Sequence, residues 1–136
     1  MLQLDARLAL AENLLGRCET LYDIGSNHGF LAVHMLRTGR CRRAVLCDIS
    51  ADALSRARGL VARAGLADRA AFAVTDGFAG LDPQPGDAAA ILGMGGRTIA
   101  AILREGLPCP VVLQANVEIA CARRRVEQAG MHIARE

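Results

Sequence analysis

The chain has 136 residues, the usual length of a single domain. Hydrophobic residues make up 52% of it and aromatic residues only 3%, so the core must be built from Ala, Val, Leu and Ile; a disordered chain and a disulfide miniprotein both fit this composition poorly. All 16 basic side chains are Arg, and 14 acidic residues reduce the formal net charge to +2, which excludes a strongly basic nucleic-acid coat.

The sequence also argues against membrane and metal functions. No apolar stretch approaches the ~20 residues that cross a bilayer, and Asp5 and Arg7 stand where a signal peptide would be apolar. We therefore expect a cytoplasmic protein. The five cysteines show no C-x-x-C spacing, which indicates reduced thiols and no metal site. Arginines gather at 37–43 and at 123–125, where solvated helix ends and phosphate contacts are both open interpretations.

Helices and strands are predicted to alternate along the chain. A helix is expected over 5–15, with Asp5 as its N-cap and Gly16 as its stop. Further elements are expected as strands at 20–24, 44–48, 70–74, 87–92 and 110–113, and as helices at 29–37, 50–64, 96–105 and 118–128. Short apolar strands separated by helices predict a doubly wound, mostly parallel α/β sheet over 20–136, whose ligands bind beyond the carboxyl ends of the strands.

The loop after the first strand reads D-I-G-S-N-H-G. A dinucleotide fingerprint starting at Gly25 would need glycines where Asn27 and Phe30 stand, so a nicotinamide cofactor is not expected. An acid, a glycine two residues later and another glycine four further on are typical of loops that hold S-adenosylmethionine. Asp23 can offset the positive charges of that ligand, and the glycines let the backbone approach it.

Acids also end the next two strands. Asp48 can accept hydrogen bonds from both ribose hydroxyls, and Asp76 can accept one from the adenine amino group, with Phe78 or a neighbouring apolar group against the ring. Each acid also has a simpler explanation, a helix cap for Asp48 and a D-G turn for Asp76. Three acids at successive strand ends favour the ligand. The expected cofactor-binding residues are Asp23, Gly25, Ser26, Asn27, Gly29, Asp48, Ile49, Asp76, Gly77 and Gly93.

The last two loops read G-M-G-G at 93–96 and L-Q-A-N at 113–116. A loop with few side chains lets a flat base approach in line with the bond to the transferred methyl group. The amides of Gln114 and Asn116 suit recognition of a base edge, although both could instead tie down loop backbone. The expected substrate-binding residues are Met94, Gly95, Gly96, Gln114 and Asn116. His34, inside a predicted helix, is expected to be a core or surface residue.

From Leu4 to about Ile133 the chain resembles the bacterial tRNA adenine-22 N1-methyltransferases, which are class I S-adenosylmethionine-dependent enzymes. The resemblance rests on L-D-A-R-L, D-I-G-S-N-H-G-F-L and T-D-G-F, and most specifically on G-M-G-G together with L-Q-A-N. Family members typically carry an acid, Ala, Tyr and Pro where this chain has Asn27, Gly29, Phe30 and Ala115.

The resemblance implies methyl transfer from S-adenosylmethionine to N1 of adenine-22 in tRNA. It implies cofactor contacts from Gly25, Asp48 and Asp76. The catalytic residues are expected to be Asp23, which compensates positive charge, Asn116, which positions the base through its 6-amino group, and His28, which lies near the acceptor. Two alternatives stay open: a methyltransferase of the same fold with another acceptor, and a cofactor-binding fragment that is catalytically weak.

The resemblance also bears on length. A complete fold of this class ends in an antiparallel hairpin, whereas here the sixth strand could only span 131–134 and no seventh strand fits. We therefore expect an incomplete final hairpin, and we expect the helical C-terminal domain of the family to be absent. The fifth strand would then be partly uncovered, which predicts self-association through that sheet edge.

Overall fold

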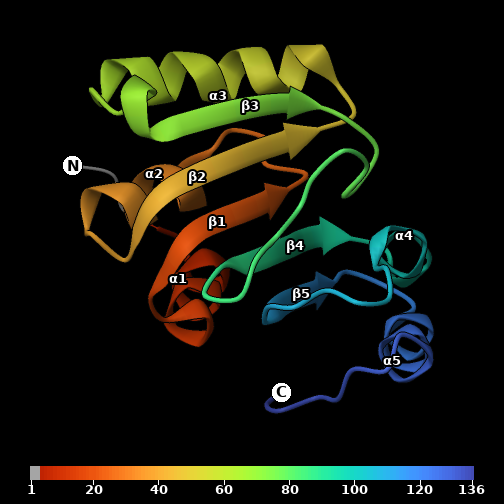
Figure 1. Ribbon diagram of the computed structural model, residues 1–136. Coiled ribbons are helices and arrows are strands. Elements are labelled where there is room, and N and C mark those ends of the chain that lie inside the picture. Colours follow the sequence, from red (N-terminus) through yellow and green to blue (C-terminus); the bar gives the residue numbers. More distant parts are fainter. Residues whose placement is uncertain (1–3) are drawn as a thin grey trace.

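A computed structural model describes residues 4–136 (Figure 1). In chain order its elements are α1 (Ala6–Leu15), β1 (Cys18–Ile24), α2 (Phe30–Arg37), β2 (Cys41–Asp48), α3 (Ala51–Arg63), the 3-10 helix η1 (Ala67–Arg69), β3 (Ala70–Val74), β4 (Ala88–Met94), α4 (Gly96–Ile102), β5 (Val111–Ala115) and α5 (Ile119–Gln128). The strands form one parallel five-stranded sheet in the order β3-β2-β1-β4-β5. This confirms the predicted fold class, and every strand ends at the same edge (Figure 1).

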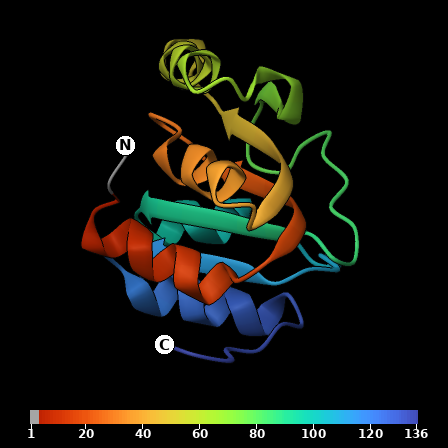
Figure 2. The same ribbon diagram turned by 90° about the vertical axis from the view of Figure 1, so that its left-hand side faces the viewer.

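Helices cover both faces of the sheet. α1, α2 and α3 step across one face, and α4 and α5 pack together on the other (Figure 2). Each face has its own apolar core because strand side chains alternate between the two faces. Leu21 and Leu46 are fully buried in the first core, and Ile91 and Ile99 in the second. Between β1 and β4 the strand order reverses direction, and this is where a doubly wound sheet opens a ligand crevice.

The crossover from β3 to β4 contains no helix among the described residues. Residues 75–87 form turns and loop that run across the second face of the sheet (Figure 1). Phe78, which is 3% exposed, belongs to the core beneath this loop, and the Arg104 guanidinium lies 5.6 Å from the centre of its ring. The expectation that Phe78 lies against a ligand is therefore wrong, because its ring fills space that a crossover helix would otherwise cover.

The strands are longer than the apolar runs that predicted them. β1 and β2 begin at Cys18 and Cys41, which are partners in the parallel register, so the polar residues that follow them also belong to the sheet. β5 lies at an edge with β4 as its one partner strand within residues 4–136. The sixth strand predicted at 131–134 is not formed. The terminal segment instead turns back toward α5, where Glu136 accepts a hydrogen bond from Arg123 (2.6 Å).

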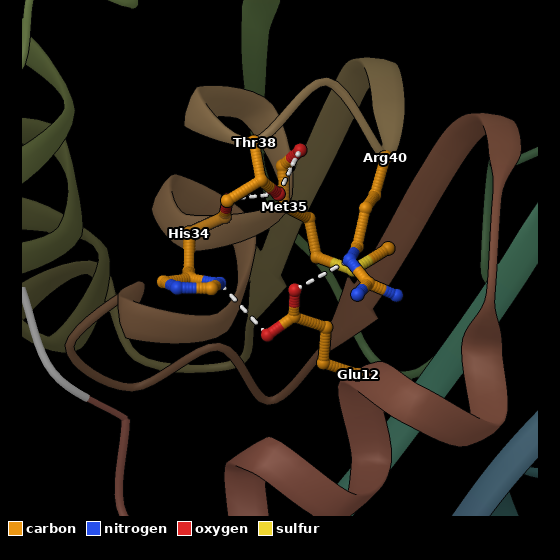
Figure 3. A network of polar contacts seen from close by, with 5 residues as sticks. All are labelled: Glu12, His34, Met35, Thr38 and Arg40. Atoms are coloured by element: carbon orange, nitrogen blue, oxygen red, sulfur yellow. Dashed lines mark hydrogen bonds and ion pairs between the residues drawn. The ribbon is translucent and has the colours of Figure 1, made fainter.

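A buried carboxylate fastens α1 to its neighbour α2. Asp5 caps α1 as predicted, since its Oδ1 accepts a hydrogen bond from the Leu8 amide (2.8 Å). Two turns further on, the Glu12 side chain is 8% exposed, and its two oxygens lie 2.7 Å from His34 Nδ1 and 2.7 Å from Arg40 Nε (Figure 3). His34 thus has a structural place beside Glu12, and the charge of Arg40 is used inside the fold.

The described residues contain neither a membrane-spanning helix nor a cluster of metal-binding side chains. No helix in 4–136 is long and apolar enough to cross a membrane. In the same range, no three His, Cys, Asp or Glu side chains are grouped to hold a metal ion. The cysteines are free thiols, and burial raises the pKa of Cys47 to about 12, so this thiol stays protonated and unreactive at neutral pH.

Candidate functional site

The sheet order brings three of the predicted acids into one row. Asp23, Asp48 and Asp76 end or follow β1, β2 and β3, which are neighbours in the sheet. All three stand at the carboxyl edge, beside the point where the strand order reverses. We call these three residues the acid row. The acid row is the first half of the candidate site, and the loops after β4 and β5 are the second.

Asp23 is the most buried member of the acid row, at 5% exposed. Burial raises the pKa of its carboxyl to about 7, a hydrogen bond from Ser26 opposes that rise, and the charge of Asp48 adds to it. A buried carboxylate is costly without a positive partner. A cationic ligand beside Asp23 would therefore stabilise the ionised form of this buried carboxyl and be attracted by its negative charge.

Asp48 is held in a fixed orientation by backbone amides. Its Oδ1 accepts from the Ser50 amide (2.9 Å), and its Oδ2 accepts weakly from the Asn27 amide (3.4 Å). Each carboxylate oxygen keeps a further lone pair for a ligand. Asn27 reaches this position with φ 54°, a left-handed conformation that non-glycine residues adopt at a cost and that is common at functional sites.

The first loop is tied to the end of β2. The amides of Gly25 and Ser26 both donate to the Cys47 carbonyl, at 2.8 and 3.0 Å. Gly25 has φ 76°, and a Cβ there would collide with the terminal methyl of Met94, so this glycine brings the first and fourth loops together. At Gly29, with φ 82°, a Cβ would instead stand 3.1 Å from the Ala57 Cβ and 3.2 Å from Leu46, so this glycine permits close packing against α3 and β2.

The far end of the acid row combines an exposed carboxylate with exposed apolar side chains. Asp76 is exposed, whereas Gly77 is buried with its backbone against Ile102. Ile49 is 75% exposed and Val74 is 57% exposed, directly after β2 and at the end of β3. Sequence reasoning missed Val74, because a valine at the end of a buried strand resembles any core residue.

The second half of the site is built around Gln114. Its Oε1 accepts from the Gly93 amide (2.8 Å), and its Nε2 donates to Asn116 Oδ1 (2.9 Å). A backbone N–H can only donate, so the Gly93 amide fixes which way the Gln114 side chain points and, through it, which way Asn116 points. Of the two interpretations left open for Gln114, the structure supports the one in which it ties down loop backbone.

Arg7 also reaches this half of the site, and sequence reasoning did not single it out. Its Nη1 donates to Gln114 Oε1 at 3.3 Å, and the same atom lies 2.8 Å from where a Cβ on Gly93 would stand. Arg7 belongs to α1, which packs beside β4 and β5 (Figure 2). Arg7 is part of the L-D-A-R-L motif, but that motif alone does not indicate which residue its arginine contacts.

The glycines at 95 and 96 have different surroundings. Gly95 is half-buried beside Val117, 3.5 Å from where its Cβ would stand. Gly96 is buried, and a Cβ there would overlap the backbone of Glu118, so its contribution is the close packing of α4 against the last loop. Glu118 has φ 55°; it and Asn27 are the two non-glycine residues with positive φ among the described residues, and both flank the site.

The donor set of the acid row fits the parts of S-adenosylmethionine. A buried carboxylate suits an ammonium or sulfonium charge, an oriented carboxylate suits a ribose diol, and an exposed carboxylate beside apolar side chains suits the amino edge and face of adenine. The second half offers amide groups and an arginine instead of acids. His28, expected near the acceptor, is exposed and stacks on Phe30 with ring centres 5.3 Å apart.

Comparison with known proteins places this geometry among methyltransferases. Residues 4–136 match the family described as "Methyltransferase domain". A curated relative from Mycoplasma pneumoniae, named "Putative tRNA methyltransferase", is 37% identical over 94 residues, which are 64% of this chain and 40% of the relative.

Solved structures agree. The chain is similar to the M1A22 tRNA methyltransferase TrmK of B. subtilis, with a TM-score of 0.85, 26% identity, and coverage of 94% of this chain and 57% of that one. It is also similar to Streptococcus pneumoniae Sp1610 in complex with S-adenosyl-L-methionine, with a TM-score of 0.89, 25% identity, and coverage of 98% and 65%. The chain thus spans 40 to 65% of the length of these relatives.

Proposed function

Because the chain belongs to the methyltransferase domain family, we propose that it binds S-adenosylmethionine and transfers its methyl group to N1 of adenine-22 in tRNA. The observation that carries this proposal is the acid row lying next to the G-M-G-G and L-Q-A-N loops at one sheet edge. The similarity to a tRNA methyltransferase and to a structure containing S-adenosyl-L-methionine supports it.

In this proposal the acid row holds the cofactor. Asp23 lies beside the ammonium or sulfonium charge, Asp48 accepts from the ribose hydroxyls, and Asp76 accepts from the adenine amino group. Gly25, Ser26, Asn27 and Gly29 shape the first loop around the methionine part, Ile49 and Val74 lie against the base, and Gly77 and Gly93 contribute backbone.

When bound, S-adenosylmethionine supplies an electrophilic methyl group on a positively charged sulfur. The N1 lone pair of adenine is the nucleophile, so the chain needs no strong base and acts mainly by orienting the acceptor. Asn116 Oδ1 already accepts from Gln114 and has a second lone pair for the 6-amino group of the target adenine. Met94 and Gly95 would line the acceptor space, and His28 would contact RNA outside it.

Gln114 is a positioning residue in this mechanism. It holds the Gly93 backbone and the Asn116 amide in one orientation. Arg7, 3.3 Å from Gln114 Oε1, adds positive charge where an RNA phosphate would approach. A preorganised amide loses no free energy to reorientation when the base arrives.

We further propose that residues 1–136 constitute the cofactor-binding domain, that the protein works in the cytoplasm and that it self-associates through the β5 edge. The edge position of β5 supports the last point. Sedimentation at increasing concentration would test it.

Two measurements test the function. Calorimetry with S-adenosylmethionine should show binding, and incubation with an unmodified tRNA transcript should yield 1-methyladenine at position 22. Binding without methylation of any tRNA would contradict the proposed reaction and support a cofactor-binding module. Methylation of a small molecule or protein in place of tRNA would instead support another acceptor.

A further inference from the structure

A groove lies beside the acid row, between the first loop and α3. Its volume is about 370 Å³, and its lining includes His28, Phe30, Arg56, Gly59 and Arg63. His28 follows Asn27, whose amide contacts Asp48, so the groove begins next to the carboxylate proposed to hold the ribose. Apart from His28, none of these lining residues has a role in the site described above.

One wall of the groove is aromatic. The His28 and Phe30 rings are stacked, 5.3 Å apart and inclined by 24°. Phe30 is still 40% exposed, although the chain has only three Phe and one Tyr with which to build its core. An exposed ring already in a stack can accept one further flat ring, and nucleobases stack on such side chains with little dependence on sequence.

The lining also carries positive charge from Arg56 and Arg63. Other arginines are committed: Arg40 pairs with Glu12, Arg123 pairs with Glu136, and Arg69 donates to backbone carbonyls. Within residues 4–136, by contrast, no acidic side chain forms an ion pair with Arg56 or Arg63, and both are exposed. Of the arginine stretches that stand out in the sequence, Arg40 and Arg123 are thus paired within the fold, whereas Arg56 and Arg63 remain available to an anion.

The floor of the groove contains an unusual glycine. Gly59 lies in the interior of α3, where glycine is less favourable than alanine, and it does not have the positive φ that would require glycine. Arg63 Nη1 lies 3.0 Å from where its Cβ would stand. The absence of a side chain lets the guanidinium of Arg63 lie close over the helix.

We propose that this groove binds one nucleotide of the RNA substrate outside the target adenosine, with its base on Phe30 and its phosphate on Arg56 and Arg63. The proposal rests on the proposed function in taking tRNA as the RNA. Arginine fits phosphate with paired N–H donors, and the volume admits a single nucleotide whose neighbours continue into solvent.

The test uses an unmodified tRNA transcript and follows its affinity as a function of salt. The double variant Arg56→Gln, Arg63→Gln should bind about tenfold more weakly, and the slope of log affinity against log salt should fall by about two, one for each arginine that no longer neutralises a phosphate. Phe30→Ala should weaken binding by about tenfold with an unchanged salt slope, because stacking does not depend on counterions.

Two further variants separate binding from folding and from general charge. Arg58→Gln removes a charge from the same helix, but Arg58 lies over the Phe72 ring (4.5 Å) outside the groove, so its affinity should stay near that of the parent. Gly59→Ala should raise or preserve the unfolding midpoint and still weaken RNA binding, since the added methyl displaces Arg63.

The outcomes distinguish this groove from the function itself. The groove proposal would be overturned if the parent and the double variant had equal affinities and salt slopes, or if Arg58→Gln lost as much affinity as the double variant. Neither result would contradict tRNA methylation. Groove-dependent RNA binding without methyl transfer would leave the groove intact and contradict the proposed reaction. A parent chain that binds no tRNA would contradict both.

Discussion

The two halves of the site use their polar groups in opposite ways. In the acid row the carboxylates keep lone pairs free, and burial raises the pKa of the most buried one, Asp23, to about 7. In the second half the amides of Gln114 and Asn116 are bonded to each other and to the Gly93 backbone. One half is thus prepared to gain interactions from a ligand, while the other uses its interactions to hold a shape.

This difference suggests that the acid row recognises its ligand by charge and that the second half of the site orients its ligand. Removing an acid should weaken ligand binding, because the acid interacts directly with the ligand. Removing an amide should slow the transfer, because the amide interacts with other groups of the protein. Substitutions in each half test that division.

The largest effect is expected for Asp48→Ala. Losing hydrogen bonds from two ribose hydroxyls to a charged group should weaken S-adenosylmethionine binding by about 100-fold in calorimetry. Asp48→Asn, which can still accept from the Ser50 amide, should lose about tenfold. Asp68→Ala, exposed at the opposite end of the sheet, serves as the control. If the Asp48 variants bound the cofactor as the parent does, the acid row would not hold the ribose.

Asp23 predicts a pH dependence of stability. Its folded pKa of about 7 lies above the ordinary value of 3.8, so the folded state binds a proton more tightly than the unfolded state, and stability falls as pH rises. Between pH 5 and pH 8 the apo protein should lose about 2 kcal/mol through this group, measured by denaturant unfolding. Asp23→Asn should remove that component of the slope.

The same carboxyl predicts how the cofactor should bind. A positive charge beside Asp23 lowers its pKa, so binding releases a proton and should become tighter between pH 6 and pH 8. Asp23→Asn should bind with little pH dependence in this range. A parent affinity that weakened as pH rose would contradict the pairing of Asp23 with a cation.

Gln114 tests the second half. Gln114→Leu leaves the Gly93 amide without its acceptor and should lower the turnover number by about tenfold while cofactor affinity changes less than threefold. Gln114→Glu keeps an acceptor for that amide but cannot donate to Asn116, so it should fold well and still turn over slowly. Loss of cofactor affinity with normal turnover at saturation would reverse the division between the halves.

The smallest effect separates two glycines with similar backbones. Gly25 and Gly39 have φ 76° and φ 73°, but a Cβ on Gly25 would meet Met94, whereas a Cβ on Gly39 would meet nothing within 4 Å. Both alanine variants bear the cost of positive φ, and Gly25→Ala should be about 1 kcal/mol less stable than Gly39→Ala. Equal stabilities would show that Met94 can move aside without cost, so that the close contact between Gly25 and Met94 does not constrain the fold.

The contrast between the halves also shows what could be predicted from the sequence. The acid row could be predicted because each of its acids directly follows or ends a strand that is recognisable from local sequence. Parallel strands then bring their carboxyl ends to the same edge of the sheet. The Gln114–Gly93–Asn116 network was not, because the direction of an amide depends on a partner 21 residues away. Arg7 lies 107 residues from Gln114, and no short pattern marks such a contact.

The remaining misses have similar causes. Phe78 lies two residues after Asp76, which the sequence predicts to bind the cofactor. In the structure its ring is buried in the core beneath the crossover from β3 to β4, which contains no helix. Residues 131–134 have the composition of a short strand, yet the terminal segment lies near α5, where Glu136 pairs with Arg123. The fold class could be predicted from the periodicity of apolar residues. The positions of Phe78 and of the terminal segment depend instead on tertiary packing, which local sequence does not encode.

The two side-chain contacts of Glu12 bear on where the chain can be shortened. They connect the far half of α1 to α2 and to the residue before β2 (Figure 3). The near end of the same helix presents Arg7 to Gln114. A derivative beginning at Arg17 would retain the whole sheet and every member of the acid row. It would nevertheless lack α1, whose Arg7 contacts Gln114 in the second half of the site. We therefore expect that a minimal catalytic unit must include α1 as well as the five strands.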